Sequence, residues 1–148
     1  MALKEKINED MKSAMKSGDK TRLQTIRSIR ALILEFEKSG QDKELTSEVE
    51  LNMLTSAAKK RKESIEQYRN AGREDLATAE ESELAIIQEY LPKQLSEDEI
   101  RQEIVKIAAE VGASTKQDFP KLMPAVMKAL KGKADGKVIK GIVDSFLS

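Results

Sequence analysis

Cysteine, histidine and tryptophan are all absent from this chain of 148 residues, and aromatic residues make up only 3% of it. Without cysteine there is no disulfide, no thiolate nucleophile and no thiolate metal site. Without histidine, the commonest general base and metal ligand is missing as well. Because these absences exclude most familiar catalytic constellations, we expect the chain to hold no catalytic residue, no metal and no cofactor.

Long apolar runs are also missing. No stretch approaches the roughly 18 apolar residues that a bilayer-spanning helix needs. Residues 1–10 alternate charged side chains with isolated apolar ones, which is unlike a secretory signal peptide. These features predict a protein without membrane association and with a cytoplasmic location.

Neither sign of charge is in excess, since 26 basic and 26 acidic residues give a net charge of zero. A neutral total argues against a protein that its overall field holds on nucleic acid. The distribution is uneven, however. Residues 74–99 hold nine acidic residues and one basic residue, whereas residues 113–148 hold seven basic and three acidic residues. Any attraction for an anion must therefore be local.

The chain is rich in helix-forming residues, with 39% hydrophobic and 35% charged residues arranged at helical spacing. The first helix should span about residues 3–17, and Asp19 should cap a second that ends near Gly40. Ser47 and Glu50 form a capping-box pattern that opens a third helix, stopped by Gly72. A fourth follows over roughly residues 75–90. We expect these four amphipathic helices to form one bundle.

Pro92 prevents a continuous helix after this bundle, and Ser96 with Glu99 forms a second capping-box pattern. The helix that follows should end at Gly112, and Ser114 with Gln117 suggests a further box. The next helix, within residues 115–130, contains two prolines, so we expect a kink or a late start, and a last helix follows Gly136. The prediction is an all-α fold: a bundle over residues 1–91, a proline-containing linker over 92–96 and a three-helix domain over 97–148.

Basic side chains gather near the start of the last predicted helix, where backbone N–H groups would also attract an anion. We therefore predict phosphate binding there, with a second basic surface on the second helix. The same pattern is also typical of a helix stop followed by a solvated lysine face. The candidate nucleic-acid-binding residues are Lys128, Lys131, Lys133, Lys137, Lys140, Arg27 and Arg30.

Three other patterns favour simpler interpretations. Gly132-Lys133 is no nucleotide-binding loop, because Met127 and Ala134 occupy the places of its other required residues. The basic run at residues 59–62 should be a solvated face paired with nearby glutamates on the same helix, and the acidic residues at 80–83 should form an exposed face. Tyr68 and Tyr90 fall on apolar stripes, so contacts with RNA should reach backbone and shape rather than bases.

Three stretches carry a family resemblance: Glu-Tyr-Leu-Pro-Lys-Gln-Leu-Ser at 89–96, Val-Gly-Ala-Ser at 111–114, and Lys-Gly-Lys-Ala-Asp-Gly at 131–136, followed by Val138 and Ile142. With them, the chain resembles the YqeY family over essentially its whole length. That family is similar to the C-terminal helical and tail regions of GatB, a subunit of the glutamine-dependent transfer-RNA amidotransferase. The resemblance implies an all-helical protein with a larger N-terminal bundle and a smaller C-terminal three-helix domain, the part that in the amidotransferase helps to hold transfer RNA. It implies no active site, because both catalytic centres of that enzyme lie outside the similar region.

Our first hypothesis is therefore a non-catalytic helical module that binds transfer RNA or a transfer-RNA-dependent enzyme. An alternative is a protein adaptor that makes no direct RNA contact. A third is a carbon–nitrogen ligase with glutamine as the amido donor, which only the family association suggests. It would need an unrecognised lysine, serine or carboxylate centre, because the usual nucleophiles and bases are missing.

Overall fold

A computed structural model describes residues 2–39 and 44–148, and in these residues every regular element is helical. The all-α class predicted from the sequence is thus confirmed. The chain divides into two compact units, Met1–Leu91 (unit 1) and Pro92–Ser148 (unit 2). Each is described by itself below. No helix in the described ranges combines the length and the apolar character needed to cross a bilayer.

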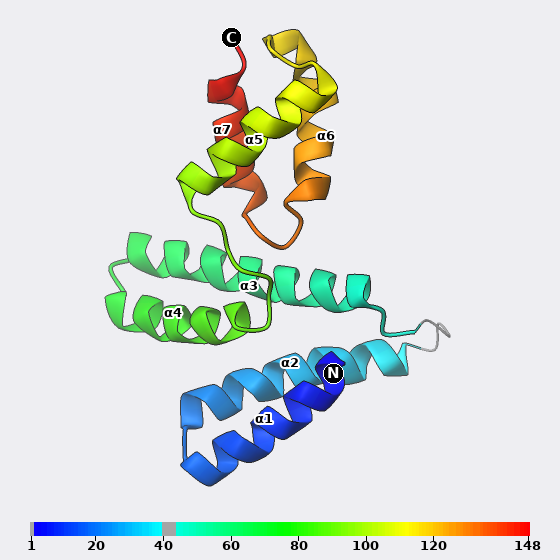
Figure 1. The fold of residues 1–148 in the computed structure, drawn as a ribbon. Helices are drawn as coiled ribbons and strands as arrows, with labels where there is room; N and C mark the ends of the chain where they lie inside the picture. Colours follow the sequence, from blue (N-terminus) through cyan, green and yellow to red (C-terminus); the bar gives the residue numbers. More distant parts are fainter. Residues whose placement is uncertain (1, 40–43) are drawn as a thin grey trace. The chain divides into compact units, whose positions relative to one another are not determined.

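Unit 1 contains α1 (Leu3–Ser17), α2 (Lys20–Lys38), α3 (Ser47–Asn70) and α4 (Glu74–Gln88). Helix α1 lies along α2, α3 lies along α4, and α4 packs on α2 (Figure 1). All four helices contribute apolar side chains to one buried cluster. Burial of these apolar stripes is what holds the helices together. The members of the cluster are Leu3, Ile7, Ala14, Ile26, Ile29, Ile33, Leu54, Ala57, Ala58 and Ile87.

The ends of these helices follow local chemistry. Gly18 takes a left-handed conformation with φ of 73° and ends α1, and the Asp19 carboxylate then accepts the backbone N–H of Arg22 at 3.0 Å, as predicted. The predicted capping box at Ser47 and Glu50 is wrong. Thr46 is the cap, and its hydroxyl accepts the N–H of Val49 at 3.2 Å. Threonine is also a favoured N-cap residue, so the adjacent Thr46 can take the role predicted for Ser47.

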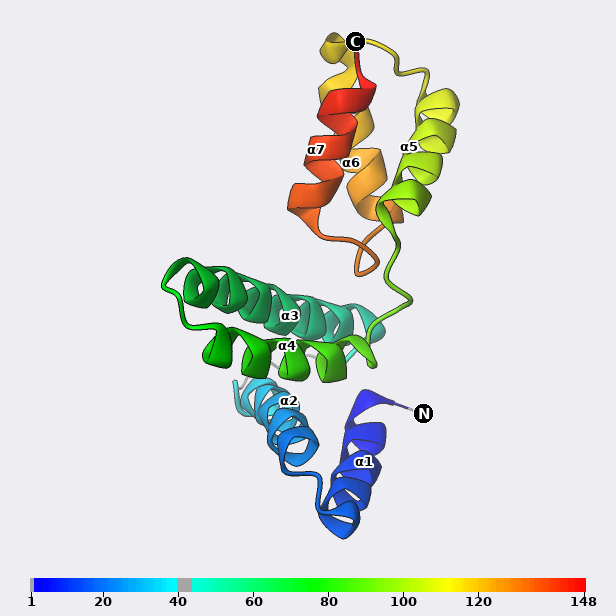
Figure 2. The same cartoon turned by 90° about the vertical axis from the view of Figure 1, so that its left-hand side faces the viewer.

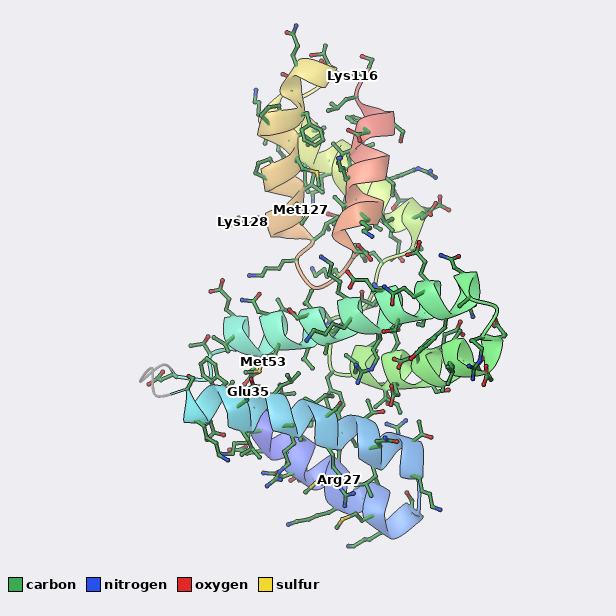
Figure 3. The ribbon with its side chains drawn as sticks, turned by 180° about the vertical axis from the view of Figure 1, so that it is seen from behind. Arg27, Glu35, Met53, Lys116, Met127 and Lys128 are labelled. Carbon is green, nitrogen blue, oxygen red and sulfur yellow. The ribbon has the colours of Figure 1, made fainter. Side chains whose placement is uncertain are left out.

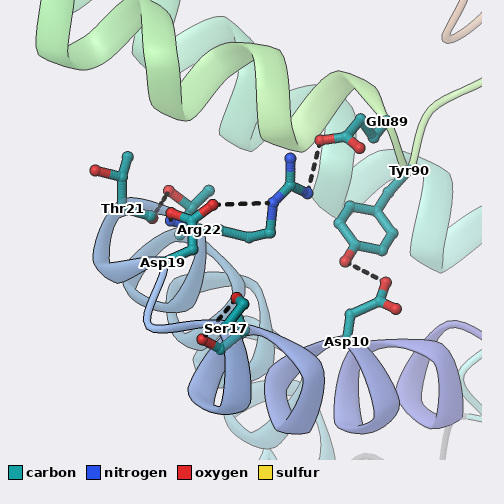
Figure 4. Close-up of polar contacts among 9 residues, drawn as sticks. Asp10, Ser17, Asp19, Thr21, Arg22, Glu89 and Tyr90 are labelled. Atoms are coloured by element: carbon teal, nitrogen blue, oxygen red, sulfur yellow. Dashed lines mark hydrogen bonds and ion pairs between the residues drawn. The ribbon is translucent and has the colours of Figure 1, made fainter.

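Polar contacts hold the end of α4 against the first two helices (Figure 4). The Tyr90 hydroxyl donates to Asp10 on α1 at 2.6 Å, and Arg22 on α2 donates to Glu89 at 2.9 Å. Burial, together with the hydrogen bond to Asp10, raises the pKa of Tyr90 far above its usual range. Tyr90 is therefore a packing residue of unit 1, as its place on the apolar stripe indicated.

The acidic cluster of α4 is not the exposed face that we predicted. Arg61 on α3 lies 3.4 Å from a Glu80 oxygen and 3.1 Å from a Glu83 oxygen, while Arg69 pairs with Glu81. Only 22% of the Arg61 side chain and 23% of the Glu80 side chain are exposed. Because α3 and α4 lie side by side, one member of the basic run at 59–62 faces the acidic residues of the neighbouring helix. Burial is the main cause that raises the pKa of Glu80; Glu83 adds to it and Arg61 opposes it.

Unit 2 contains α5 (Glu97–Val111), a short 3₁₀ helix η1 (Lys116–Asp118), α6 (Phe119–Ala129) and α7 (Gly136–Phe146). The three α-helices contact one another (Figure 2) and enclose a second core that shares no residue with the first. Its buried members are Ile100, Ile104, Ile107, Ala108, Ala113, Leu122, Val126, Leu130, Ile139, Ile142, Val143 and Leu147.

Two of the capping predictions for unit 2 have different outcomes. The box at Ser96 and Glu99 is confirmed, with both reciprocal hydrogen bonds present at 3.0 and 3.2 Å. The box at Ser114 and Gln117 is wrong, because Asp118 takes the glutamine's role one residue later. The late start expected after residue 115 is confirmed, since η1 precedes α6 and Pro120 occupies its first turn.

Three apolar residues that fall at helical spacing with the buried stripes of α1 and α7 are exposed: Met15 at 51%, Val138 at 37% and Phe146 at 36%. Each lies within three residues of a helix end, where the neighbouring helices no longer cover the edge of the apolar stripe. The period of the sequence predicts the buried stripe correctly at the helix centres and less well at the ends.

We predict that Glu80→Gln removes a pH-dependent loss of stability in unit 1. Because the folded-state pKa of Glu80 is raised above its ordinary value of 4.5, its contribution to stability is greatest below that value and falls as the pH rises through the raised pKa. Urea unfolding at several pH values should therefore show the variant gaining on the parent as the pH rises. Arg61→Ala should instead cost about 1 kcal/mol at neutral pH, since it leaves two carboxylates facing each other. Equal pH profiles for the parent and Glu80→Gln would contradict this interpretation.

Candidate nucleic-acid interface

The segment of residues 128–137, called the lysine turn here, comprises the end of α6, the connection that follows it and the start of α7. Helix α6 ends at Ala129, and the carbonyl of the next residue, Leu130, accepts the N–H of Lys133 at 2.9 Å. Gly132 has a φ of 77°, a left-handed conformation that a side chain would strain. The Lys-Gly-Lys sequence therefore folds into a tight reversal with a lysine on either side of its glycine.

Residues 92–96, the segment predicted as a linker, form hydrogen bonds with the backbone of this reversal. The Gln94 side-chain amide donates to the carbonyl of Gly132 at 2.7 Å and to that of Pro92 at 2.9 Å. The N–H of Leu95 donates to the carbonyl of Lys133 at 2.9 Å, and the Leu95 side chain packs on the core of unit 2. Two of the stretches that carry the family resemblance thus touch each other, although nearly 40 residues separate them.

Asp135 changes the electrostatics that we expected at the start of α7. Its carboxylate caps the helix and accepts the N–H of Lys137 at 2.9 Å. One of the backbone donors that we had assigned to a phosphate is therefore occupied, and a negative charge lies beside it. Attraction for an anion here depends on the lysine side chains rather than on the helix terminus.

Most of the predicted lysines carry charge that the protein does not neutralise. Lys128, Lys133, Lys137 and Lys140 are exposed, and within residues 2–39 and 44–148 no carboxylate forms an ion pair with any of them. Lys131 is also exposed but already has an interaction partner. The lysine turn thus presents ammonium groups on a backbone that hydrogen bonds fix in place.

Lys140, one turn after Lys137 on α7, also borders a hollow of the surface. Together with Lys116, Phe119, Asp144 and Leu147 it lines this hollow of about 550 Å³. Lys116 and Lys128 lie at opposite ends of unit 2 (Figure 3). We did not single out Lys116, Phe119 or Asp144 from the sequence. Pro120 was a sequence signal for this region. It favours a helix start close to it, and so leaves residues 116–118 outside α6.

The two predicted arginines lie on α2 in unit 1. Arg27 is exposed on this helix (Figure 3), and Arg30 donates to the side chain of Asn8 at 3.3 Å. They are therefore not part of the lysine turn. Their role in binding RNA stays a prediction.

Proteins of similar sequence occur in fungi. The chain is 36% identical to a protein of Pyrenophora tritici-repentis named "Altered inheritance of mitochondria protein 41, mitochondrial", over 87% of this chain and 71% of that protein. It is 30% identical to a protein of the same name from Kluyveromyces lactis, over 91% of this chain and 70% of that protein.

These names contradict the predicted cytoplasmic location, because both relatives are called mitochondrial. The prediction rested on the missing apolar leader and the missing apolar span. Neither feature addresses mitochondrial import, since transit peptides are amphipathic and arginine-rich rather than apolar. The prediction of a cytoplasmic location is therefore wrong.

The resemblance that the sequence motifs suggested extends over nearly the whole chain. A family model described as "Yqey-like protein" matches residues 4–147. The matched range includes all of the described helices except the first residue of α1, and it includes both segments that form the lysine turn and its support. The chain therefore belongs to the family of Yqey-like proteins.

Proposed function

We propose that unit 2 binds the phosphate backbone of a structured RNA through the lysine turn, and that this RNA is a transfer RNA. The observation that carries the proposal is that the ammonium groups of Lys128, Lys133 and Lys137 are exposed and form no ion pair within the described residues, on a backbone held by Gln94 and Leu95. Lysine contacts to phosphate supply much of the affinity of such complexes and release the counterions condensed on the RNA.

The fixed turn favours binding because it lowers the ordering cost. A flexible lysine loop would lose backbone freedom on contact with RNA, and that loss would reduce its affinity. Here the carbonyls of Gly132 and Lys133 are already bound, and Asp135 already caps α7. Only the side chains remain to be ordered when phosphates arrive.

The chemistry of the lysine turn supports recognition of backbone and shape rather than of base sequence. The residues at its tip are lysine, glycine, alanine and aspartate, none of which offers a flat surface for stacking. The choice of transfer RNA rests on the resemblance of the family to the GatB tail, which is an argument by analogy.

The double variant Lys133→Ala/Lys137→Ala should weaken binding to purified transfer RNA more than the matched variant Lys12→Ala/Lys16→Ala. Both remove the same charge, but the control lysines are exposed residues of α1 in unit 1. Gel-shift titrations at several salt concentrations measure the effect. If about four phosphates are contacted, log affinity should fall against log salt with a slope of roughly −3 to −4 in the parent, and losing two lysines should reduce its magnitude by about 2.

Equal losses in both double variants would mean that general charge, not the lysine turn, drives binding. No complex at low salt would reject RNA binding altogether. In that case the adaptor hypothesis would lead.

A hollow of about 450 Å³ between α2 and α3 in unit 1 favours the adaptor hypothesis, because its apolar lining could receive a side chain of a protein partner. The lining includes Leu32, Phe36, Val49 and Met53. Protein partners retained after ribonuclease treatment would distinguish such an adaptor from an RNA-binding module.

We further infer that the two units are separate domains, a four-helix bundle and a three-helix domain. The observation that supports this division is the presence of two cores that share no side chain. A fragment of residues 92–148 should then be helical by circular dichroism and unfold in one cooperative transition, although a domain of this size is only marginally stable. A fragment without cooperative unfolding would show that unit 2 needs unit 1.

A further inference from the structure

The hollow that contains Lys140 combines three kinds of side chain that the lysine turn does not. Lys116 comes from η1, Phe119 from the start of α6, Lys140 and Asp144 from α7, and Leu147 from the C-terminal residues. Two ammonium groups, one carboxylate and an apolar surface with an aromatic ring thus border a single space. Its volume of about 550 Å³ falls in the range typical of small-molecule sites, roughly 300–1,000 Å³.

Local hydrogen bonds fix the wall of this hollow. The Asp118 carboxylate accepts the N–H of Ser114 at 2.8 Å and that of Thr115 at 3.0 Å, and these bonds lower the pKa of Asp118. The N–H of Lys116 donates to the backbone oxygen of Ser148 at 3.3 Å. The N–H of Ser148 donates to the carbonyl of Ser114, also at 3.3 Å. The C-terminal residues are therefore tied to the segment that carries Lys116.

The charges indicate what kind of ligand the hollow accepts. A free phosphate ion would gain from the two lysines, but the carboxylate of Asp144 would repel it and the aromatic ring would contribute nothing. A purely apolar ligand would leave three charged groups without a role. A ribonucleotide uses all of them, because its phosphate suits the lysines, its base stacks on an aromatic ring and its ribose hydroxyls donate to a carboxylate.

We propose that this hollow binds one unpaired ribonucleotide of an RNA chain, with the phosphate between Lys116 and Lys140, the base on Phe119 and a ribose hydroxyl on Asp144. The proposal rests on the proposed RNA binding by unit 2 and adds a second contact at the end away from Lys128. A carboxylate that accepts the 2′-hydroxyl would select RNA over DNA. The ligand is a nucleotide within a chain rather than a free nucleotide, because the lysine turn supplies further phosphate contacts.

The test uses the full chain and a short single-stranded oligoadenylate, followed by amide chemical shifts. The largest shifts should occur at residues 116–119, 140 and 144. The ribose form should bind roughly fivefold more tightly than the deoxyribose form. Asp144→Ala should abolish that preference while leaving DNA affinity unchanged or higher. The matched variant Glu110→Ala removes the same charge from an exposed position of α5 and should keep the preference for the ribose form.

A second variant tests the base contact. Phe119→Leu keeps an apolar side chain against the core but removes the stacking surface, and it should weaken binding of the ribose form roughly 5-fold or more. A variant that keeps the parent helicity and binds with unchanged affinity would contradict the stacking role. Equal binding of RNA and DNA by the parent would overturn the role of Asp144.

The remaining outcomes separate this proposal from the one on which it rests. Shifts confined to the lysine turn would overturn the hollow and leave RNA binding intact. Shifts in the hollow combined with no effect of Lys133→Ala/Lys137→Ala on transfer RNA would instead reject the lysine turn. If adenosine monophosphate binds as tightly as the oligonucleotide, the hollow is a site for a free nucleotide, which contradicts the proposal.

Discussion

Two hydrogen bonds from the segment before α5 determine how unit 2 presents its basic residues. Gln94 and Leu95 donate to consecutive carbonyls, those of Gly132 and Lys133, at 2.7 and 2.9 Å. A turn that contains a left-handed glycine is conformationally free in the unfolded chain, and these bonds remove that freedom in the folded one. A glutamine without charge therefore controls the position of a positively charged surface.

This arrangement brings into contact two motifs of the family resemblance that lie far apart in the sequence. Leu95 also packs on the core of unit 2, so the correct position of the turn is coupled to the packing of α5, α6 and α7. Asp135 adds the third constraint by capping α7. Under the proposed function, its carboxylate would restrict an approaching phosphate to the lysine side chains, which suits recognition of a backbone whose charges are spaced along a chain.

Much of the fold could be predicted from the sequence, because the signals are local. The helical period, Gly18, Gly112 and the capping box at Ser96 all act over a few residues, and the structure follows them. The contacts that build the site are of another kind. The bond from Gln94 to Gly132 and the shared hollow of Lys116 and Lys140 join residues more than 20 positions apart. No period or spacing reports such tertiary neighbours, so Gln94 and Lys116 were missed, whereas the exposure of the lysines could be predicted.

The most direct measurement of the central claim compares the parent with Gln94→Ala, which leaves every charge in place. Backbone ¹⁵N order parameters of residues 131–135 and affinity for transfer RNA would be measured on the same samples. The account predicts that order in the turn falls and that affinity falls with it, by several-fold, while unit 2 keeps its helicity. A variant whose turn loses order but whose affinity for RNA is unchanged would contradict it.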